Sequence, residues 1–306
     1  MAIKKDIWRT GLCFAPVDDI VTMGGFSGFD VTWLPDMPRS YQFRADPFGL
    51  RLGDSLHLFS EVFDYRDRHG RIEWAALDAK GRVIESRIVL EKPWHLSYPQ
   101  VFASDGEIWM LPEAFQSGKL TLYRARTFPD EWEATCDIAL GEDVAIDATM
   151  LNFHGMWWLF YTPLHAVQNG VNALHCAYAN RLTGHWTRHA GNPIRVDHAS
   201  ARPGGMAVEI DGQVMLPVQD CVGGYGRGIR PLWFDSLSPA SVKLSCGPRL
   251  NPAPGFAPYL EGLHTLSACG DLTFFDVKKR TLSPNLLIIE ARRALRNRAA
   301  QRSRNA

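Results

Sequence analysis

The segment SYPQVFASDGEIWMLPE, residues 97–113, combines a short apolar strand, an Asp-Gly dipeptide and an aromatic strand. Asp105 and Gly106 are a strong signal for a two-residue turn, because a type I′ turn needs positive φ at both central positions. The flanking runs are short and contain Val, Ile, Phe and Trp, which is typical of strands. The segment therefore predicts a tight β-hairpin.

The same hairpin pattern recurs four more times along the chain. Each copy has a polar entry, an apolar strand, a turn glycine and a second apolar or aromatic strand. The other copies are RADPFGLRLGDSLHLFSE (44–61), AIDATMLNFHGMWWLFYTP (145–163), SARPGGMAVEIDGQVMLPVQD (200–220) and EGLHTLSACGDLTFFD (261–276). The turn glycines of the five copies lie 49 to 58 residues apart, at Gly53, Gly106, Gly155, Gly212 and Gly270.

Further strand-like segments follow the hairpins, at 72–84, 119–132, 174–186 and 229–239. Four short strands in a repeat of about 40–60 residues are typical of a β-propeller blade. Five repeats predict an all-β, five-bladed β-propeller over residues 1–280. Residues 7–16 have no repeat of their own, so we expect them to complete the last blade and close the ring. The alternatives are a β-sandwich or two separate β-domains.

The residues after the last repeat, 281–306, predict a basic amphipathic helix from about Asn285 to Gln301. Leu286, Ile289 and Leu295 form an apolar stripe, and six arginines follow Glu290. One interpretation is a solvated, partly disordered chain end. The other is a helix in weak contact with an anionic membrane surface, where each basic side chain contributes about 1 kcal/mol.

Composition excludes several classes of protein. The 306 residues are 46% hydrophobic and carry 33 basic and 33 acidic side chains, which is ordinary for a soluble globular protein. The chain has no run of about 18 apolar residues and no apolar segment of a secretory signal, so neither a transmembrane helix nor a signal peptide is expected. Residues 1–279 carry 26 basic and 32 acidic side chains, so no nucleic-acid partner is expected.

Cysteines and histidines show no metal-site spacing. The six cysteines form no C-x-x-C pair, and the ten histidines form no H-E-x-x-H motif. We therefore expect buried free thiols in a reducing compartment, and no structural metal. The expected location is the cytoplasm, peripheral to the inner face of the membrane if the basic helix binds lipid.

Polar residues open the inner strand of each repeat, where apolar residues would be expected. These strand starts meet at the central channel of a propeller, so their side chains are predicted to converge on one axial pocket. They are Arg44, Asp46, Tyr98, Asp147, Thr149, Ser200, Arg202, His264 and Thr265. Three acids end the second strand of a repeat: Glu61 in the first, Glu113 in the second and Asp220 in the fourth. Each residue alone is equally consistent with capping a turn or bridging two blades.

Several carboxylates that face one cavity shift each other's pKa values apart, as a general acid and a general base require. Glycoside hydrolysis uses two such groups. The glycine-rich stretch VGGYGRG, 222–228, precedes a strand rather than a helix, so it is no phosphate-binding loop. We expect it to form a mobile loop at the pocket rim, with a plain turn between blades as the alternative.

The motifs FRADPFGLR, LFSEVFDYR, HLSYPQVF, WMLPEAFQSGKLTLYRA, DATMLNFHGMWWLF and LPVQDCVGGYGRGI occur in this order between Trp8 and Asp276. Together they resemble a family of bacterial β-propellers similar to the N-terminal domain of plant glucosamine inositolphosphorylceramide transferase. More distantly, the chain resembles the five-bladed furanosidase propellers of the arabinanase and fructosidase families. That likeness rests on the blade count and on Ala45-Asp46-Pro47.

The furanosidase resemblance implies that Asp46 is a base or nucleophile and that Asp147 orients the sugar and tunes the proton donor. The arabinanase-like families carry their proton donor, a Glu, in the fourth unit, where this chain has Arg202 in SARPGG. Glu113 is the best substitute for the proton donor, and Glu61 is second. A furanosidase-type channel Ca²⁺ is compatible with the sequence but not required by it.

Together with the acids predicted at the pocket, the resemblance implies a carbohydrate-active enzyme, either a glycosyltransferase or a glycosidase-like protein of polysaccharide biosynthesis. Its ligand would be a furanose-like, anionic or nucleotide-activated sugar, because the planar fork of an Arg binds phosphates and carboxylates well. Asp46, Glu113 and Asp147 are the predicted catalytic set. The predicted substrate-binding residues are Arg44, Glu61, Tyr98, Arg202, Asp220 and His264. The alternative is a non-catalytic glycan-binding or scaffold propeller that partners a glycan-assembly enzyme.

Overall fold

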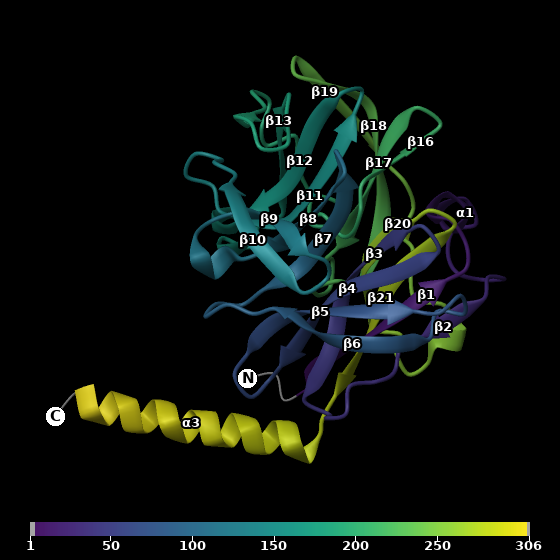
Figure 1. Cartoon of the computed structure of the whole chain (residues 1–306). Helices are drawn as coiled ribbons and strands as arrows, with labels where there is room; N and C mark the ends of the chain where they lie inside the picture. The colour runs from purple at the N-terminus through teal and green to yellow at the C-terminus, as the bar shows by residue number, and fades with distance from the viewer. Residues whose placement is uncertain (1–3, 305–306) are drawn as a thin grey trace.

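A computed structural model describes residues 4–304, with side chains to residue 295. Residues 4–304 form five antiparallel sheets that surround a central axis (Figure 1). Neighbouring sheets contact each other through their innermost strands, as β3 does with both β7 and β20. The five-bladed β-propeller predicted from the repeat is therefore confirmed.

Each blade runs outward from the axis in chain order, except the last. Blade one contains β3 (Gln42–Leu52), β4 (Ser55–Asp64), β5 (His69–Leu77) and β6 (Val83–Leu90). Blade two contains β7 (Ser97–Ser104), β8 (Glu107–Glu113), β9 (Thr121–Thr127) and β10 (Glu131–Asp137). Blade three contains β11 (Ala145–Phe153), β12 (Met156–Pro163), β13 (Ala173–Ala179), β14 (Thr187–Arg188) and β15 (Arg195–Val196). Blade four contains β16 (Val208–Ile210), β17 (Gln213–Asp220), β18 (Gly228–Ser238) and β19 (Ser241–Cys246).

Blade five is assembled from both ends of the chain. Its strands from the axis outward are β20 (Gly262–Cys269), β21 (Leu272–Thr281), β1 (Lys5–Cys13) and β2 (Val31–Trp33). The antiparallel register of β1 and β21 runs from Lys5 opposite Thr281 to Cys13 opposite Thr273. The N-terminal strand thus supplies the third strand of the last blade, and this pairing closes the ring.

The hairpin turns between the first and second strands have the geometry that their sequences require. Asp105 and Gly106 both have positive φ, at 51° and 76°, and Asp211 and Gly212 have 50° and 79°. Positive φ at both central positions is the type I′ conformation predicted from the two Asp-Gly pairs. These turns lie at the end of each inner strand opposite to its polar start.

A bulge interrupts the inner strand of four blades near its polar start. The pairing skips two residues between Ala45 and Phe48, Ser97 and Gln100, Ile146 and Thr149, and Leu263 and Leu266. In blades one to three the first skipped residue has φ near +50°: Asp46 at 50°, Tyr98 at 47° and Asp147 at 49°. Such a conformation is unfavourable for residues other than Gly, and it is often found at functional sites.

The hydrophobic core lies between neighbouring blades. One cluster joins Phe48 and Phe59 of blade one to Val101 and Met110 of blade two, all fully buried. Large apolar side chains on the faces of the sheets fill the space between neighbouring blades. The polar residues at the axis are thus held by a rigid apolar frame.

The helices are short except for the last. They comprise α1 (Val17–Thr22), α2 (Leu164–Gln168), α3 (Pro284–Arg304) and the 3-10 turns η1 (Phe115–Ser117) and η2 (Pro254–Phe256). The sequence predicted only the C-terminal helix, because α1 and α2 are single turns in loops without a helical period. No helix within residues 4–304 is long and apolar enough to cross a membrane.

All six cysteines are free thiols. Cys13, Cys176 and Cys269 are buried as predicted, whereas Cys136 and Cys221 are partly buried. The prediction of burial is wrong for Cys246, which is exposed because it lies on β19, the outer edge strand of blade four.

Candidate functional site

A cavity of about 250 Å³ lies at the axis, at the end of the propeller where the bulges are. Six of the nine predicted site residues line it: Asp46, Glu61, Glu113, Asp147, Arg202 and His264. Trp8, Phe43, Phe63, His95, Ser97 and Tyr225 complete its wall. A larger hollow of about 550 Å³ lies against the outer strands of blade two, far from this cluster of buried charges. We take the axial cavity as the candidate site because buried carboxylates, an arginine and a histidine line its wall.

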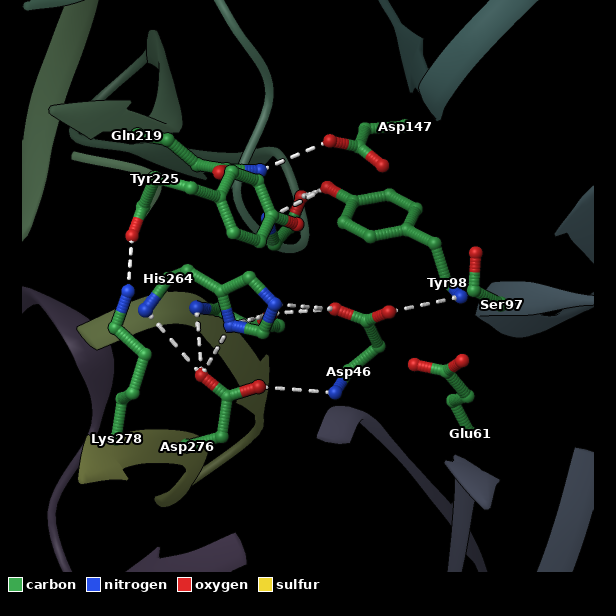
Figure 2. A network of polar contacts seen from close by, with 12 residues as sticks. Asp46, Glu61, Ser97, Tyr98, Asp147, Gln219, Tyr225, His264, Asp276 and Lys278 are labelled. Carbon is green, nitrogen blue, oxygen red and sulfur yellow. Dashed lines mark hydrogen bonds and ion pairs between the residues drawn. The ribbon is translucent and has the colours of Figure 1, made fainter. Parts of the chain in front are cut away.

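His264 lies between two carboxylates, which Figure 2 shows from close by. Its Nδ1 is 2.7 Å from Asp276 Oδ1, and its Nε2 is 3.3 Å from Asp46 Oδ1. The second Asp276 oxygen accepts the backbone N–H of Asp46 at 2.9 Å. All three side chains are almost fully buried. Blade five therefore positions the bulge residue of blade one directly.

Asp147 is held by two side chains of blade four. Arg202 donates from Nε to Asp147 Oδ2 at 2.6 Å, and Gln219 donates from Nε2 to the same oxygen at 2.9 Å. Glu113 accepts the Asp147 backbone N–H at 2.9 Å. The largely buried Arg202 thus has the carboxylate partner that a guanidinium needs away from water.

Glu61 has a different environment from Glu113. Its Oε1 has no hydrogen-bond partner among the described residues, although His95 Nε2 lies 3.4 Å away. The backbone N–H of Gly70 donates to His95 Nδ1 at 2.9 Å, so Nδ1 is the unprotonated nitrogen of this ring. Burial lowers the pKa of His95 to about 4, so the neutral ring carries its proton on Nε2, which is the nitrogen closer to Glu61.

Burial dominates the electrostatics of the cavity. It raises the pKa of Asp46 to about 6, against the opposing charge of His264. Burial, together with the neighbouring carboxylates, raises the pKa of Glu61 and of Glu113 well above the ordinary range. Burial lowers the pKa of His264, but Asp276 and Asp46 outweigh it, so the pKa is raised. Burial and neighbouring charges thus shift the pKa values of these carboxyl groups upward and make each group a candidate for proton exchange.

Aromatic side chains enclose His264. Trp8 stacks on the imidazole with ring centroids 3.7 Å apart, and Tyr225 meets it edge-on at 5.3 Å. The Lys278 Nζ lies 4.9 Å from the Trp8 ring centre and donates to the Tyr225 carbonyl. Trp8 is therefore occupied by a residue of the protein, and it orients His264 rather than offering a free platform to a sugar.

Gly226 lets the glycine-rich loop approach this cluster. It has φ of 57°, and a Cβ at this position would lie 2.6 Å from the Cβ of His264 and 2.9 Å from Trp8. Its carbonyl accepts the N–H of Leu263 at 3.0 Å. The loop predicted at the pocket rim thus contributes Tyr225 to the cavity wall.

Three predicted site residues do not line the cavity. Arg44 donates from Nε to Glu73 Oε2 at 2.6 Å within blade one. The Tyr98 hydroxyl is bonded to Thr149 Oγ1 at 2.9 Å and to both the N–H and the carbonyl of Gly205. Asp220 accepts from Arg230 Nε at 3.0 Å and from the Val222 N–H at 3.0 Å. Each of these residues has internal partners and connects parts of the fold.

The remaining polar residues predicted at the pocket act as supports. The Thr149 and Tyr98 hydroxyls form a hydrogen bond with each other, and the Thr265 hydroxyl donates to Asp46 Oδ1 at 3.0 Å. Ser200 pairs with Arg195 at 2.7 Å. None of the three is among the cavity-lining residues of the described chain.

Sequence reasoning missed Asp276, Trp8, His95, Gln219 and Tyr225 as members of the site. A signal existed for Asp276, because the fifth repeat ends on this acid as the first and second end on Glu61 and Glu113. Trp8 and His95 lie outside the repeats, in the segments that precede an inner strand or close the ring. No spacing in the sequence connects them to the axis.

The Asp46, His264 and Asp276 side chains can be tested as a cation site, since one ligand atom of each lies within 4.8 Å of the others. Ca²⁺ takes six to eight oxygen ligands, roughly, and seldom an imidazole. Both ring nitrogens of His264 face the two carboxylates, and Thr265 already donates to Asp46. This donor set fits a hydrogen-bonded imidazole between two acids, and it does not fit calcium.

Comparison with known proteins connects this site with a family. Residues 31–243 match the family described as glucosamine inositolphosphorylceramide transferase 1, N-terminal. The protein of that name from Oryza sativa subsp. indica is 37% identical over 206 residues, which are 66% of this chain and 27% of the relative. The one from Arabidopsis thaliana is 34% identical over 241 residues, 76% of this chain and 30% of the relative. The chain belongs to this family, and it matches less than a third of each relative's length.

Solved structures share the fold at low sequence identity. Zg3597, a family 117 glycoside hydrolase from Zobellia galactanivorans, superposes with a TM-score of 0.56 at 13% identity, over 80% of this chain and 88% of that one. The catalytic domain of a family 62 α-L-arabinofuranosidase from Coprinopsis cinerea has a TM-score of 0.55 at 13% identity, over 82% and 94%. The family and both of these solved structures are named after proteins that act on carbohydrates.

Proposed function

We propose that the chain is a carbohydrate-active enzyme that makes or breaks a glycosidic bond in the axial cavity. The observation that carries this proposal is the group of buried carboxyl side chains, Asp46, Glu61 and Glu113, that line one cavity. Glu61 and Glu113 have pKa values well above the ordinary range, whereas that of Asp46 is about 6. An acid that holds its proton at neutral pH, close to a carboxylate that has lost its own, is what glycosyl chemistry requires.

In this mechanism Glu113 is the general acid and Asp46 the general base. The Glu113 proton passes to the oxygen of the leaving group as the bond between that oxygen and the anomeric carbon breaks. Asp46 accepts the proton of the incoming hydroxyl, from water in hydrolysis or from a sugar alcohol in transfer, as the new bond forms. Asp147 orients both Arg202 and Glu113: its carboxylate accepts from Arg202 Nε, and its backbone N–H donates to the Glu113 carboxyl group.

The ligand in this proposal is an anionic sugar, or a nucleotide-activated sugar of which only the sugar unit occupies the cavity. The volume of about 250 Å³ is below the roughly 300–1,000 Å³ typical of sites for drug-sized ligands, which favours one ring over an oligosaccharide. Arg202 spends Nε on Asp147, and no described residue accepts from its two terminal nitrogens. Its guanidinium centre lies 5.0 Å from the Tyr225 ring centre, and the terminal nitrogens could bind a phosphate or carboxylate.

The assignment of the acid can be tested with a matched pair. Glu113→Gln and Glu61→Gln remove one buried carboxyl each, at corresponding positions of blades one and two. Turnover is measured by mass spectrometry on a panel of nucleotide-sugars and aryl glycosides, including uronic acids and furanosides. We expect Glu113→Gln to lower kcat by about 10²–10⁴-fold, the usual contribution of general acid catalysis, and Glu61→Gln to lower it far less. The reverse order would transfer the role to Glu61.

A non-catalytic glycan-binding or scaffold propeller is the second candidate. It is favoured by the inter-blade bonds of Asp46, which accepts Thr265 Oγ1 at 3.0 Å and the Tyr98 N–H at 3.2 Å. A carboxylate with both oxygens in use is a good tie between blades one, two and five. Thermal shift with the same panel decides between the two: saturable stabilisation without turnover by any member, in wild type and in Asp46→Asn alike, would support the scaffold.

The cytoplasmic location, the role in polysaccharide biosynthesis and the absence of a resident cofactor remain predictions from the sequence. Fractionation of the native host would test the location. Loss of a defined surface polysaccharide in a deletion strain would test the role.

A further inference from the structure

We propose that α3 docks on an anionic lipid surface and thereby turns the cavity end of the propeller toward that surface. This inference does not depend on the catalytic proposal. It rests on how the helix is attached, on what its free face carries and on where it leaves the propeller (Figure 1).

One face of α3 is fastened to the propeller. Leu286 is fully buried, and Glu290 pairs with Lys5 at 3.2 Å and with Arg68 at 3.4 Å. Arg293 donates to the Tyr65 carbonyl. At about 3.6 residues per turn, Leu286, Glu290 and Arg293 follow one side of the helix. The first turns of α3 therefore have a defined orientation.

The opposite face carries apolar side chains in solvent. Leu287 is 45% exposed, Ile288 49% and Leu295 64%. The helical period places Ile288 and Leu295 opposite the fastened side and Leu287 about 90° from it. None of them packs on a described residue strongly enough to be buried. These three exposed aliphatic side chains form an apolar patch on α3, which is suited to an apolar partner.

The charge of the segment identifies the partner. Glu290 is the single acid of residues 280–306, and Lys5, Arg68 and Arg293 already neutralise it. The segment carries seven arginines against this one acid, so its sequence has a net charge of about +6 beside the apolar residues. Exposed aliphatic side chains on a strongly basic helix suit contact with an anionic membrane surface, where each basic side chain contributes about 1 kcal/mol.

The point of attachment sets the orientation. Asn285 donates to Ser40 Oγ at 3.2 Å, and Arg293 contacts Tyr65. These contacts flank Phe43 and Phe63, which lie on the cavity wall. The hairpin turns at residues 53–54 and 105–106 lie at the other end of the inner strands. A membrane bound by α3 would therefore lie on the cavity side.

Vesicle co-sedimentation of the full chain tests the docking. The probes are vesicles of phosphatidylcholine alone and of phosphatidylcholine mixed with phosphatidylserine. We expect binding to the mixed vesicles only, and weaker binding as salt increases. The combined change of Arg296, Arg298, Arg302 and Arg304 to Gln should lower the partition coefficient by about a thousandfold. Changing Leu287, Ile288 and Leu295 to Ser should lower it at least about tenfold.

Arg124→Gln with Arg126→Gln is the control, because it removes one half-buried and one exposed arginine from blade two and leaves α3 intact. This variant should bind as wild type does. Equal recovery of wild type in the supernatant with both kinds of vesicle would overturn the proposal, as would full binding by the two α3 variants. Circular dichroism of each variant checks that the propeller is folded.

Hydrogen exchange on bound vesicles tests the orientation. Protection should increase in α3 and in residues 39–42 and 64–69, and stay unchanged in the turns at 53–54 and 105–106. Protection of the far turns instead would contradict the proposed orientation even if binding occurs.

Discussion

Blades one, two and three share a bulge that begins with a residue of positive φ, but the side chain at that position differs between them. In each, the residue that opens the bulge has φ near +50°, and its backbone N–H donates to a carboxylate of another blade. In blades one and three the residue is Asp46 or Asp147, whose carboxylate lines the cavity. In blade two it is Tyr98, whose hydroxyl reaches Thr149 and Gly205 and fills the space between blades.

The difference shows that the strained position alone does not make a site. The short side chains of Asp46 and Asp147 line the cavity and leave room for a ligand. The longer Tyr98 side chain instead forms hydrogen bonds with Thr149 and Gly205 through its hydroxyl. Both Asp46 and Tyr98 tie blades together, but only the carboxylates can also exchange a proton near neutral pH. Changing these residues one at a time can separate the two uses.

The largest effect is expected from Asp46→Asn. It keeps the size and most hydrogen bonds of the side chain but removes the base, so turnover should fall by about 10²–10⁴-fold while ligand affinity stays within a few-fold. Tyr98→Phe serves as the comparison and should keep its turnover per folded molecule. If Asp46→Asn loses binding and folding together, Asp46 is only a blade tie and the catalytic proposal fails.

The pH dependence of stability should also differ between the two positions. Burial raises the pKa of Asp46 from 3.8 to about 6, so the native state holds this proton more tightly than the unfolded chain does. The resulting stabilisation is complete below about pH 4 and is lost as the pH rises through about 6. The free energy of unfolding of wild type relative to Asp46→Asn should therefore fall by about 3 kcal/mol across this window, at about 1.4 kcal/mol per pKa unit.

Urea unfolding of wild type, Asp46→Asn and Tyr98→Phe at several pH values measures this difference. Burial raises the pKa of Tyr98 well above 10, so Tyr98→Phe should show no such window relative to wild type. A relative stability of Asp46→Asn that is flat from acid to neutral pH would show that the Asp46 pKa is not raised.

Arg202→Ala tests the partner of the blade-three acid. It should weaken the binding of an anionic sugar by about 1.5–3 kcal/mol, the scale of a hydrogen bond to a charged group. It also leaves Asp147 with Gln219 as its remaining side-chain donor, so a neutral sugar is the control ligand. Isothermal titration with both ligands separates the two effects; an equal loss for both would mean that Arg202 only supports the fold.

Tyr98→Phe should cost about 1–3 kcal/mol of stability, because the Gly205 N–H and the Thr149 hydroxyl lose a buried partner. Denaturant unfolding measures this effect, and ligand affinity should remain as in wild type. Lost affinity at unchanged stability would place Tyr98 in the ligand site after all.

Much of the architecture follows from local sequence. Positive φ at an Asp-Gly pair and the alternation of apolar residues act over a few positions, so the hairpins, their repeat and hence the number of blades could be predicted. The acids that end the second strands were also visible, and Asp276 could have been recognised by the same position in the fifth repeat. The convergence of Asp46, Asp147, Arg202 and His264 followed from the symmetry of a propeller.

Tertiary structure decided which polar side chains face the cavity. Arg44 and Asp46 are two residues apart and would share a face of a regular strand, but the bulge at Asp46 separates them and sends Arg44 to Glu73. Trp8 reaches the axis only because the N-terminal strand closes blade five, and His95 faces Glu61 only because two blades pack together. Such contacts depend on the closure of the ring and the packing of blades, which no local pattern of residues encodes.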